Sequence, residues 1–247
     1  MQRVYSRLLK EYLSYFPCVA IVGPRQCGKT TLLQELPPEW KRFDLEKTSD
    51  LQTISRDSDL FLRLNPERIA LDEAQLLPEL FSALRVAIDR NRSQKGRFVI
   101  TGSSSPELLR SVSETLAGRV GLIEMAPFSM AEAYQLPESP FFSCLTEKSS
   151  LENLKDRLSA RLDIRQAHDY WFRGGYPEPW LQNDPRFTEV WMDQYVHTYI
   201  QRDIARLFPG LNQNRFHLFI QLLASLSNTI INYSDVARPH LHLAEAA

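Results

Sequence analysis

One short segment, GPRQCGKT at 23–30, restricts the possible folds of this chain more than any other. It satisfies the full pattern G-x-x-x-x-G-K-[ST], between the apolar run CVAIV and the helix-like segment TTLLQEL. In such a strand–loop–helix context, glycines let successive backbone N–H groups point at phosphate oxygens, and the positive end of the helix adds to the attraction. An ordinary glycine turn with a chance lysine would not explain both flanking elements. The segment therefore predicts a phosphate-binding loop.

Residues of this loop have separate predicted roles. We expect Lys29 to reach the β and γ phosphates of a nucleotide, and the Thr30 hydroxyl to complete the coordination of Mg²⁺, a hard cation that takes oxygen ligands. ATP and Mg²⁺ are thus the predicted cofactors. The predicted binding set is Gly23, Pro24, Arg25, Gln26, Cys27, Gly28, Lys29, Thr30 and Thr31.

Two adjacent acids, Asp72 and Glu73, directly follow a second apolar run. The carboxyl ends of parallel strands face bound phosphates, so Asp72 is predicted to act at Mg²⁺. Adjacent strand residues point to opposite sides, which makes Glu73 the candidate general base for a water that attacks the γ-phosphate. The alternative is that the acids only begin the next helix, where they favour its positive end. Their position downstream of a complete phosphate loop favours the catalytic interpretation.

Small polar residues end a further apolar run, RFVITGS at 97–103. Ser103 is predicted to sense the γ-phosphate or to orient water. The alternative is structural, because Ser105 followed by Pro106 fits a helix N-cap with proline at the first position.

Arg119, in LAGR at 116–119, is predicted to supply positive charge to the transition state, within the chain or across a subunit boundary. The alternative is a surface arginine after a glycine helix stop, with Arg25 and Arg202 as rival arginines. The predicted catalytic set is Glu73, Lys29, Ser103 and Arg119.

Strand and helix patterns alternate along the first half of the chain. Such alternation implies parallel pairing and a sheet covered on both faces. The predicted class is therefore α/β, with the three-layer α/β/α arrangement and parallel sheet of a P-loop NTPase. Strands are predicted at 18–23, 41–46, 68–74, 97–103 and 120–125, and helices at 4–16, 30–36 and 80–92.

After this part, the composition shifts to proline, serine and charged residues at 136–150, which predicts a linker. A helical segment is predicted over 151–210. Within it, aromatic residues at 187, 191, 195 and 199 have four-residue spacing, which predicts a long helix at about 186–207 with a stripe that packs rather than binds ligand.

Bulk composition limits the classes of partner. The 247 residues carry a formal charge of −1, so no global positive field attracts nucleic acid or anionic membranes. Three scattered cysteines exclude a disulfide framework and a zinc site, and they favour a reducing cytoplasm. Because no apolar run reaches about 18 residues, we expect neither export nor a membrane span.

The phosphate loop, LDEAQ at 71–75 and the TGSS turn at 101–104, in this order, resemble a prokaryotic family of AAA-like P-loop ATPases. The resemblance covers most of the chain. It implies an ATPase domain at 1–135, a helical segment, a winged-helix-like unit and a restriction-nuclease-like C-terminal domain. Further matching motifs are LAGR at 116–119, PFS at 127–129, GGYPEP at 174–179 and YIQRDI at 199–204.

The resemblance weakens near the end of the sequence. NYSDVAR at 232–238 matches the opening of the winged-helix unit, with Ser234 as its N-cap, but no second helix or wing pattern follows. We therefore expect a truncated winged-helix-like region over 211–247, a disordered tail from about Pro239, and no nuclease-like domain.

These patterns predict Mg-dependent ATP hydrolysis coupled to a conformational change that acts on an unknown protein partner or a neighbouring copy. The alternative is an ATP-gated binding module, with nucleic acid as a ligand, that hydrolyses negligibly. A GTPase is disfavoured because no N-K-x-D motif occurs, and a small-molecule kinase would need an acceptor site.

Overall fold

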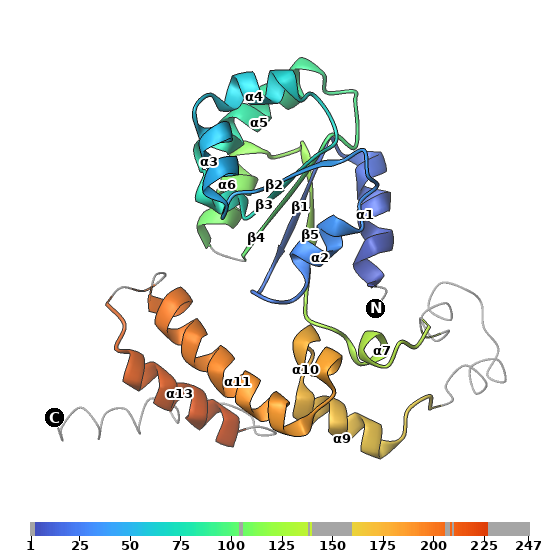
Figure 1. Ribbon diagram of the computed structural model, residues 1–247, viewed down its shortest axis with the longest axis vertical. Coiled ribbons are helices and arrows are strands. Elements are labelled where there is room, and N and C mark those ends of the chain that lie inside the picture. Colours follow the sequence, from blue (N-terminus) through green and yellow to red (C-terminus); the bar gives the residue numbers. More distant parts are fainter. Residues whose placement is uncertain are drawn as a thin grey trace. The chain divides into compact units, whose positions relative to one another are not determined.

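Five short strands form one parallel sheet, in the order β2-β3-β4-β1-β5 (Figure 1). Because β4 lies between β1 and β3, the carboxyl ends of these three strands meet at one edge. The register pairs Gly23 with Ser103 and Leu71 with Ile100. Strand bounds are Cys18–Gly23 (β1), Lys41–Asp44 (β2), Ile69–Asp72 (β3), Phe98–Ser103 (β4) and Val120–Glu124 (β5).

This computed structural model describes residues 3–103, 106–137, 139, 160–205, 208 and 210–226, without the side chains of 106, 107, 202 and 203. The chain divides into two units, Met1–Pro185 and Arg186–Ala247, and each is described by itself. Most of the predicted linker at 136–150 falls outside the described residues, as do Ser234 and the tail from Pro239. The domain boundaries drawn from the sequence therefore stay a prediction.

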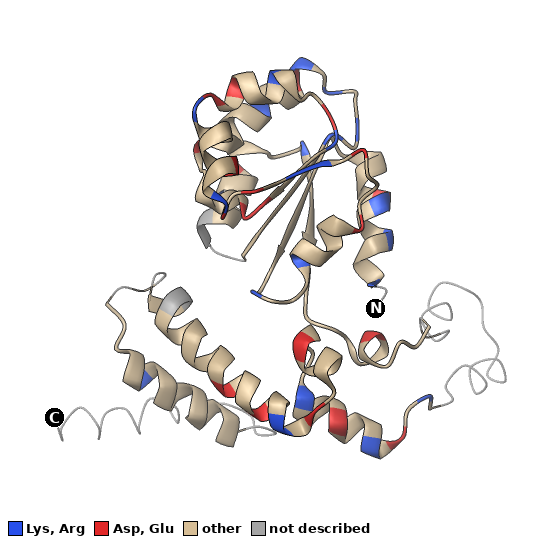
Figure 2. Cartoon of the chain, in the orientation of Figure 1, with Lys and Arg blue, Asp and Glu red and all other residues tan. Residues whose placement is uncertain are grey.

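Side chains of the central strands alternate between two apolar clusters, since successive residues of a strand point to opposite faces. In β1, Cys18, Ala20 and Val22 join one cluster, whereas Val19 and Ile21 join the other. All six β1 residues are buried. Figure 2 shows β1 and β4 without charged residues, whereas the outer helices carry both signs. A sheet buried on both faces results, as the apolar runs predict.

Helices cover both faces, which confirms the three-layer α/β/α prediction (Figure 1). Helices α1 and α2 pack with Val19 and Ile21, and helices α3 to α6 pack with the opposite cluster. The short helices α3 and α4 were not among the predicted elements. Bounds are Val4–Tyr15 (α1), Lys29–Gln34 (α2), Thr48–Ser55 (α3), Ser58–Leu64 (α4), Glu79–Arg90 (α5) and Pro106–Thr115 (α6), with a 3-10 turn at Ala74–Leu76 (η1).

Among the described residues of the first unit, β5 is followed by the helices α7 (Met130–Ala133), α9 (Ile164–Arg173) and α10 (Pro177–Gln182). The GGYPEP motif forms the turn between α9 and α10. This turn is held to the PFS motif, because the Phe128 N–H donates to the Gly175 carbonyl at 2.6 Å and the Tyr170 hydroxyl donates to the Phe128 carbonyl at 2.6 Å.

In the second unit, the predicted long aromatic helix is confirmed as α11 (Pro185–Tyr199), which continues into a π-helical turn at Ile200–Ile204. The rings of Trp191, Tyr195 and Tyr199 stack along it, with centroids 5.1 and 5.9 Å apart. Helix α13 (Gln213–Ser225) follows. Within the described helices, no stretch is long and apolar enough to cross a membrane.

Candidate functional site

The predicted phosphate loop connects β1 directly to α2, so its strand–loop–helix context is confirmed. Gly28 is the N-cap of α2, with φ 101° and ψ 20°. Only glycine adopts this left-handed conformation at little cost, which explains the second glycine of the motif. The first N–H groups of α2, at Lys29 and beyond, have no partner inside the helix and are oriented to bind an anion.

Lys29 folds back across its own loop. Its side chain is buried, at 5% exposure, and Nζ donates to the carbonyls of Gly23 at 3.0 Å and Pro24 at 2.8 Å. A buried ammonium held only by neutral carbonyls would gain from an anionic partner, because charge-assisted hydrogen bonds are stronger than neutral ones. The loop therefore fits a polyphosphate.

Asp72 is the last residue of β3 and is held inside the sheet edge. Its side chain is 6% exposed, and Oδ1 accepts hydrogen bonds from the Thr101 hydroxyl and from the Glu73 N–H at 3.2 Å. Because both bonds reach Oδ1, Oδ2 is the oxygen that would face a cation. Asp72 and Thr30 fit Mg²⁺, which takes few protein oxygens and completes its shell with water and phosphates.

Thr101 is a site residue that sequence reasoning missed. It is buried on β4, one position beyond the Leu71–Ile100 pair, so it lies opposite Asp72. The signal was present in the TGSS motif, but its use requires the strand order, which places β4 beside β3. Ser103, the predicted sensor, ends the same strand and is half-buried beside Gly23. Its sensing role stays a prediction.

Glu73 does not continue the strand, contrary to the expectation that strand pleating alone turns it away from Asp72. The strand ends at Asp72, and Glu73 adopts the left-handed conformation with φ 55° and ψ 46°. Such a conformation is unusual for a residue with a Cβ and is found most often where the surroundings enforce it. The Glu73 carboxylate accepts a hydrogen bond from Gln75 Nε2. Glu73 therefore lies at the same edge as Asp72, but a turn sets its direction.

Arg119 lies at the opposite edge of the sheet. It precedes Val120, which pairs with Cys18 at the start of β1, whereas the phosphate loop follows the end of β1. At about 3.3 Å per residue, β1 separates these ends by roughly 16 Å. Arg119 instead donates from Nε and Nη2 to the two carboxylate oxygens of Asp89, each at 2.8 Å. These bonds lower the pKa of Asp89 and raise the pKa of Arg119.

In this structure Arg119 therefore lies away from the phosphate loop of its own chain. Its catalytic role, within the chain or across a subunit boundary, stays a prediction. Of the rival arginines, Arg25 lies in the loop itself, and the Arg202 side chain is outside the described residues.

A cavity of about 130 Å³ adjoins the loop on the α1 side. Arg3 is one of its two charged lining residues, with Glu35. Arg3 was also missed, because a basic residue before an amphipathic helix carries no motif. Arg3 donates to the carbonyls of Cys27 at 3.4 Å and Ala126 at 2.6 Å, and its Nε forms an ion pair with Glu132 at 3.1 Å. The other lining residues are Cys27, Gly28, Thr31, Leu32, Glu35, Phe128, Pro177 and Leu181.

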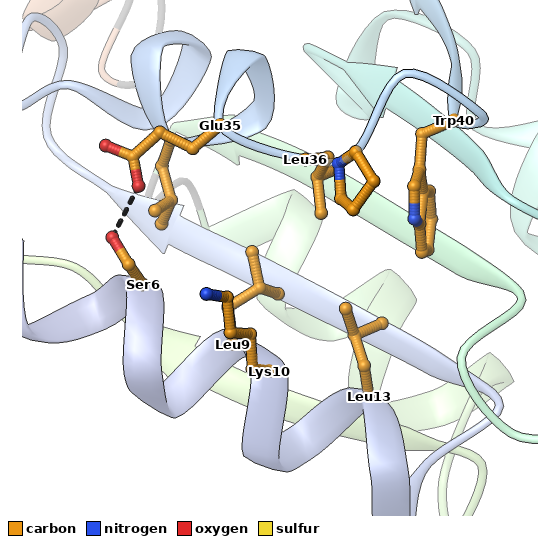
Figure 3. A pocket seen from close by; sticks show the side chains of 9 residues that line it. Ser6, Leu9, Lys10, Leu13, Glu35, Leu36 and Trp40 are labelled. Carbon is orange, nitrogen blue, oxygen red and sulfur yellow. Dashed lines mark hydrogen bonds between the residues drawn. The ribbon is translucent and has the colours of Figure 1, made fainter.

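A second cavity, of about 350 Å³, lies between α1 and the segment from α2 to Trp40 (Figure 3). Leu9, Leu13 and Trp40 make it mainly apolar, and at one end the Ser6 hydroxyl donates to Glu35 at 2.5 Å. Leu32 and Glu35 line both this cavity and the cavity beside the phosphate loop.

The sheet and its flanking helices form an α/β fold that matches P-loop ATPase structures. A Walker-type ATPase of Pyrococcus abyssi is similar in structure, with a TM-score of 0.51 and 17% identity over 97% of this chain and 82% of that chain. Residues 15–134 match a family model described as an AAA domain, and residues 164–245 match a domain of unknown function.

Two mycobacterial proteins are similar in sequence: Uncharacterized protein Rv2008c of Mycobacterium tuberculosis and Uncharacterized protein Mb2031c of Mycobacterium bovis. Each is 35% identical over 233 residues, or 93% of this chain and 46% of the relative. The chain thus spans about half the length of these relatives. Together with the structural match, the AAA match supports a P-loop ATPase family and suggests nucleotide binding.

Proposed function

We propose that the chain binds ATP with Mg²⁺ and hydrolyses it, and that the resulting conformational change acts on a protein partner or a neighbouring copy. One observation carries the proposal: the sheet order sets the Lys29 loop, the polar end of β4 and the acid pair at a single edge. A site for phosphates, a cation and an activated water needs these groups together.

Each polar group at this edge has a proposed task. The loop N–H groups and Lys29 bind phosphates, while Thr30 and Asp72 hold Mg²⁺. When bound, Mg²⁺ would neutralise charge on the β and γ phosphates. Glu73 takes a proton from water as the water oxygen bonds to the γ-phosphorus and the bond to the ADP oxygen breaks, giving ADP and phosphate.

The cavity beside the loop supports a nucleotide rather than a bare phosphate. It begins at Gly28 and Thr31, where the loop passes into α2, and its walls include the aromatic ring of Phe128. A largely apolar pocket with a few polar groups is typical for small-molecule ligands. We propose that this cavity holds the base and ribose.

The test is phosphate release from Mg-ATP by the purified chain, combined with an equilibrium nucleotide titration. We expect Lys29→Ala and Glu73→Gln both to abolish turnover, with binding lost mainly in Lys29→Ala. Lys95→Ala, a change at an exposed lysine between α5 and β4, is the matched control. Tight binding without turnover in the parent chain would favour the ATP-gated binding module, and absence of binding would refute the proposal.

A further inference from the structure

Gln75 is the closest polar neighbour that the structure gives to the proposed base. The η1 turn folds the chain back after Glu73, so that Gln75 Nε2 donates to Glu73 Oε2. The other amide atom, Oε1, is buried, and within the described part of the chain it has no hydrogen-bond partner. The amide is therefore used at one end only.

The Gln75 amide, whose Nε2 bonds to Glu73, packs closely against the neighbouring strand β4. A Cβ on Gly102 of β4 would lie 2.1 Å from Gln75 Oε1 and 2.6 Å from Leu108 of α6. Gly102 has no positive φ, so close approach of the Gln75 amide and Leu108, rather than backbone freedom, explains a glycine here. The absence of a Cβ on Gly102 thus leaves room for the Gln75 amide where its Nε2–H group reaches Glu73.

An amide with a buried, unbonded oxygen destabilises the folded state unless its N–H group makes a compensating hydrogen bond. A buried carbonyl without a hydrogen bond is unfavourable, and methionine has nearly the same length without a polar atom to satisfy. The bond from Nε2 to Glu73 is thus the contact that distinguishes glutamine from an apolar residue.

We propose that Gln75 is a positioning residue for hydrolysis, which rests on the proposed ATPase function. A carboxylate has about four acceptor sites. One N–H group at Oε2 fixes the plane of the Glu73 carboxylate and leaves Oε1 for the attacking water. Orientation is needed here because the left-handed turn leaves the Glu73 side chain half-buried at the sheet edge.

The experiment compares kcat and the Kd for ATP in Gln75→Met and Gln75→Glu, each in the parent chain and in Glu73→Gln. Methionine keeps the length without the N–H group, and glutamate keeps the shape but repels Glu73. We expect kcat to fall about tenfold to a hundredfold in both variants, because part of the general-base catalysis by Glu73 is lost. The Kd for ATP should change less than about twofold. Gln52→Met, at an exposed position on α3, is the control for a surface glutamine.

A positioning residue acts only through the group that it orients. In Glu73→Gln, residual single-turnover rates should therefore be the same with and without Gln75→Met. Unchanged or raised kcat in both Gln75 variants, or an equal loss in the Glu73→Gln background, would refute the positioning role alone. A parent chain without turnover, or one indifferent to Glu73→Gln, would refute the ATPase proposal and this one together.

Discussion

The hydrogen bond from Thr101 to Asp72 joins two buried side chains on adjacent strands. We expect Thr101→Val to raise the Mg²⁺ concentration needed for half-maximal turnover by about tenfold to a hundredfold. Loss of a group that orients a metal ligand typically lowers metal affinity by this factor. Thr101→Ser keeps the hydroxyl and should retain most of the parent affinity. The measurement is turnover against Mg²⁺ at saturating ATP. Equal behaviour of the valine and serine variants would show that the hydroxyl is not what orients Asp72.

A second residue-scale prediction concerns Cys18, because burial raises the pKa of its thiol from 9.0 to about 12. Above pH 9 the unfolded chain releases this proton and the folded chain keeps it, so stability is full below that pH and falls as pH rises toward 12. The slope is about 1.4 kcal/mol per pH unit.

Urea unfolding of the parent chain and Cys18→Ala at pH 8 and pH 10 isolates this thiol from other groups that titrate in the same range. We expect the parent to lose about 1.4 kcal/mol more than Cys18→Ala over this interval. The same loss in both proteins would mean that Cys18 ionises equally well in the folded chain.

Sequence alone predicted residues whose motif states their chemistry, but not residues whose role depends on a neighbour in space. Lys29 and Asp72 belong to motifs whose order along the chain favours one chemical role for each. Thr101 and Arg3 become visible only when β4 is known to pair with β3 and when the start of α1 is known to lie beside the phosphate loop. The left-handed backbone of Glu73 was missed for a related reason, because β3 ends at Asp72, two residues before the end of the predicted strand at 68–74.

At the scale of elements, the ion pair between Arg3 and Glu132 joins the start of α1 to α7. Both side chains are 6% exposed, and Glu132 also accepts from the backbone N–H groups of Val4 at 3.0 Å and Ser129 at 2.9 Å. Arg3 further bonds the carbonyl of Cys27. One buried pair thus links two helices to the phosphate loop.

We expect Glu132→Gln to lower the free energy of unfolding by about 3–5 kcal/mol, because it leaves the Arg3 charge buried without its counterion. Urea denaturation measures this loss. Asp59→Asn is the control: its partners Arg63 and Arg90 are 54% and 49% exposed, and exposed pairs contribute only about 0–1 kcal/mol each. A loss of similar size in the two variants would show that burial does not set the strength of the Arg3–Glu132 pair.

Helices with long periodic patterns were predicted, whereas the short helices α3 and α4 were not. The runs of β1 and β4 and the spacing of α1 and α5 extend over enough residues to define a period. Helices α3 and α4 have only 8 and 7 residues, and contact with the sheet through Ile54 and Leu62 stabilises them more than their own sequence does.

At the scale of the whole molecule, the two edges of the sheet carry different groups. The carboxyl edge carries the proposed ATP site, and the amino edge carries the pair between Arg119 and Asp89. The length of β1 separates Arg119 from the phosphate loop of its own chain. In this arrangement, we expect any catalytic role of Arg119 to act between copies of the chain.

The prediction that follows is a concentration dependence. At dilutions where light scattering shows only monomer, we expect Arg119→Ala and the parent chain to turn over ATP equally, within about twofold, because an arginine that contacted the transition state would be worth roughly 10³ or more. A large loss of turnover in the dilute monomer would mean that Arg119 reaches the site of its own chain.

At concentrations where the chain associates, turnover by the parent chain should exceed turnover by Arg119→Ala if Arg119 acts between copies. Mixing Arg119→Ala, which keeps its phosphate loop, with Lys29→Ala, which keeps its arginine, should then raise turnover above the sum of the two variants measured alone. Asp89→Asn should keep intermolecular activity because it leaves Arg119 in place.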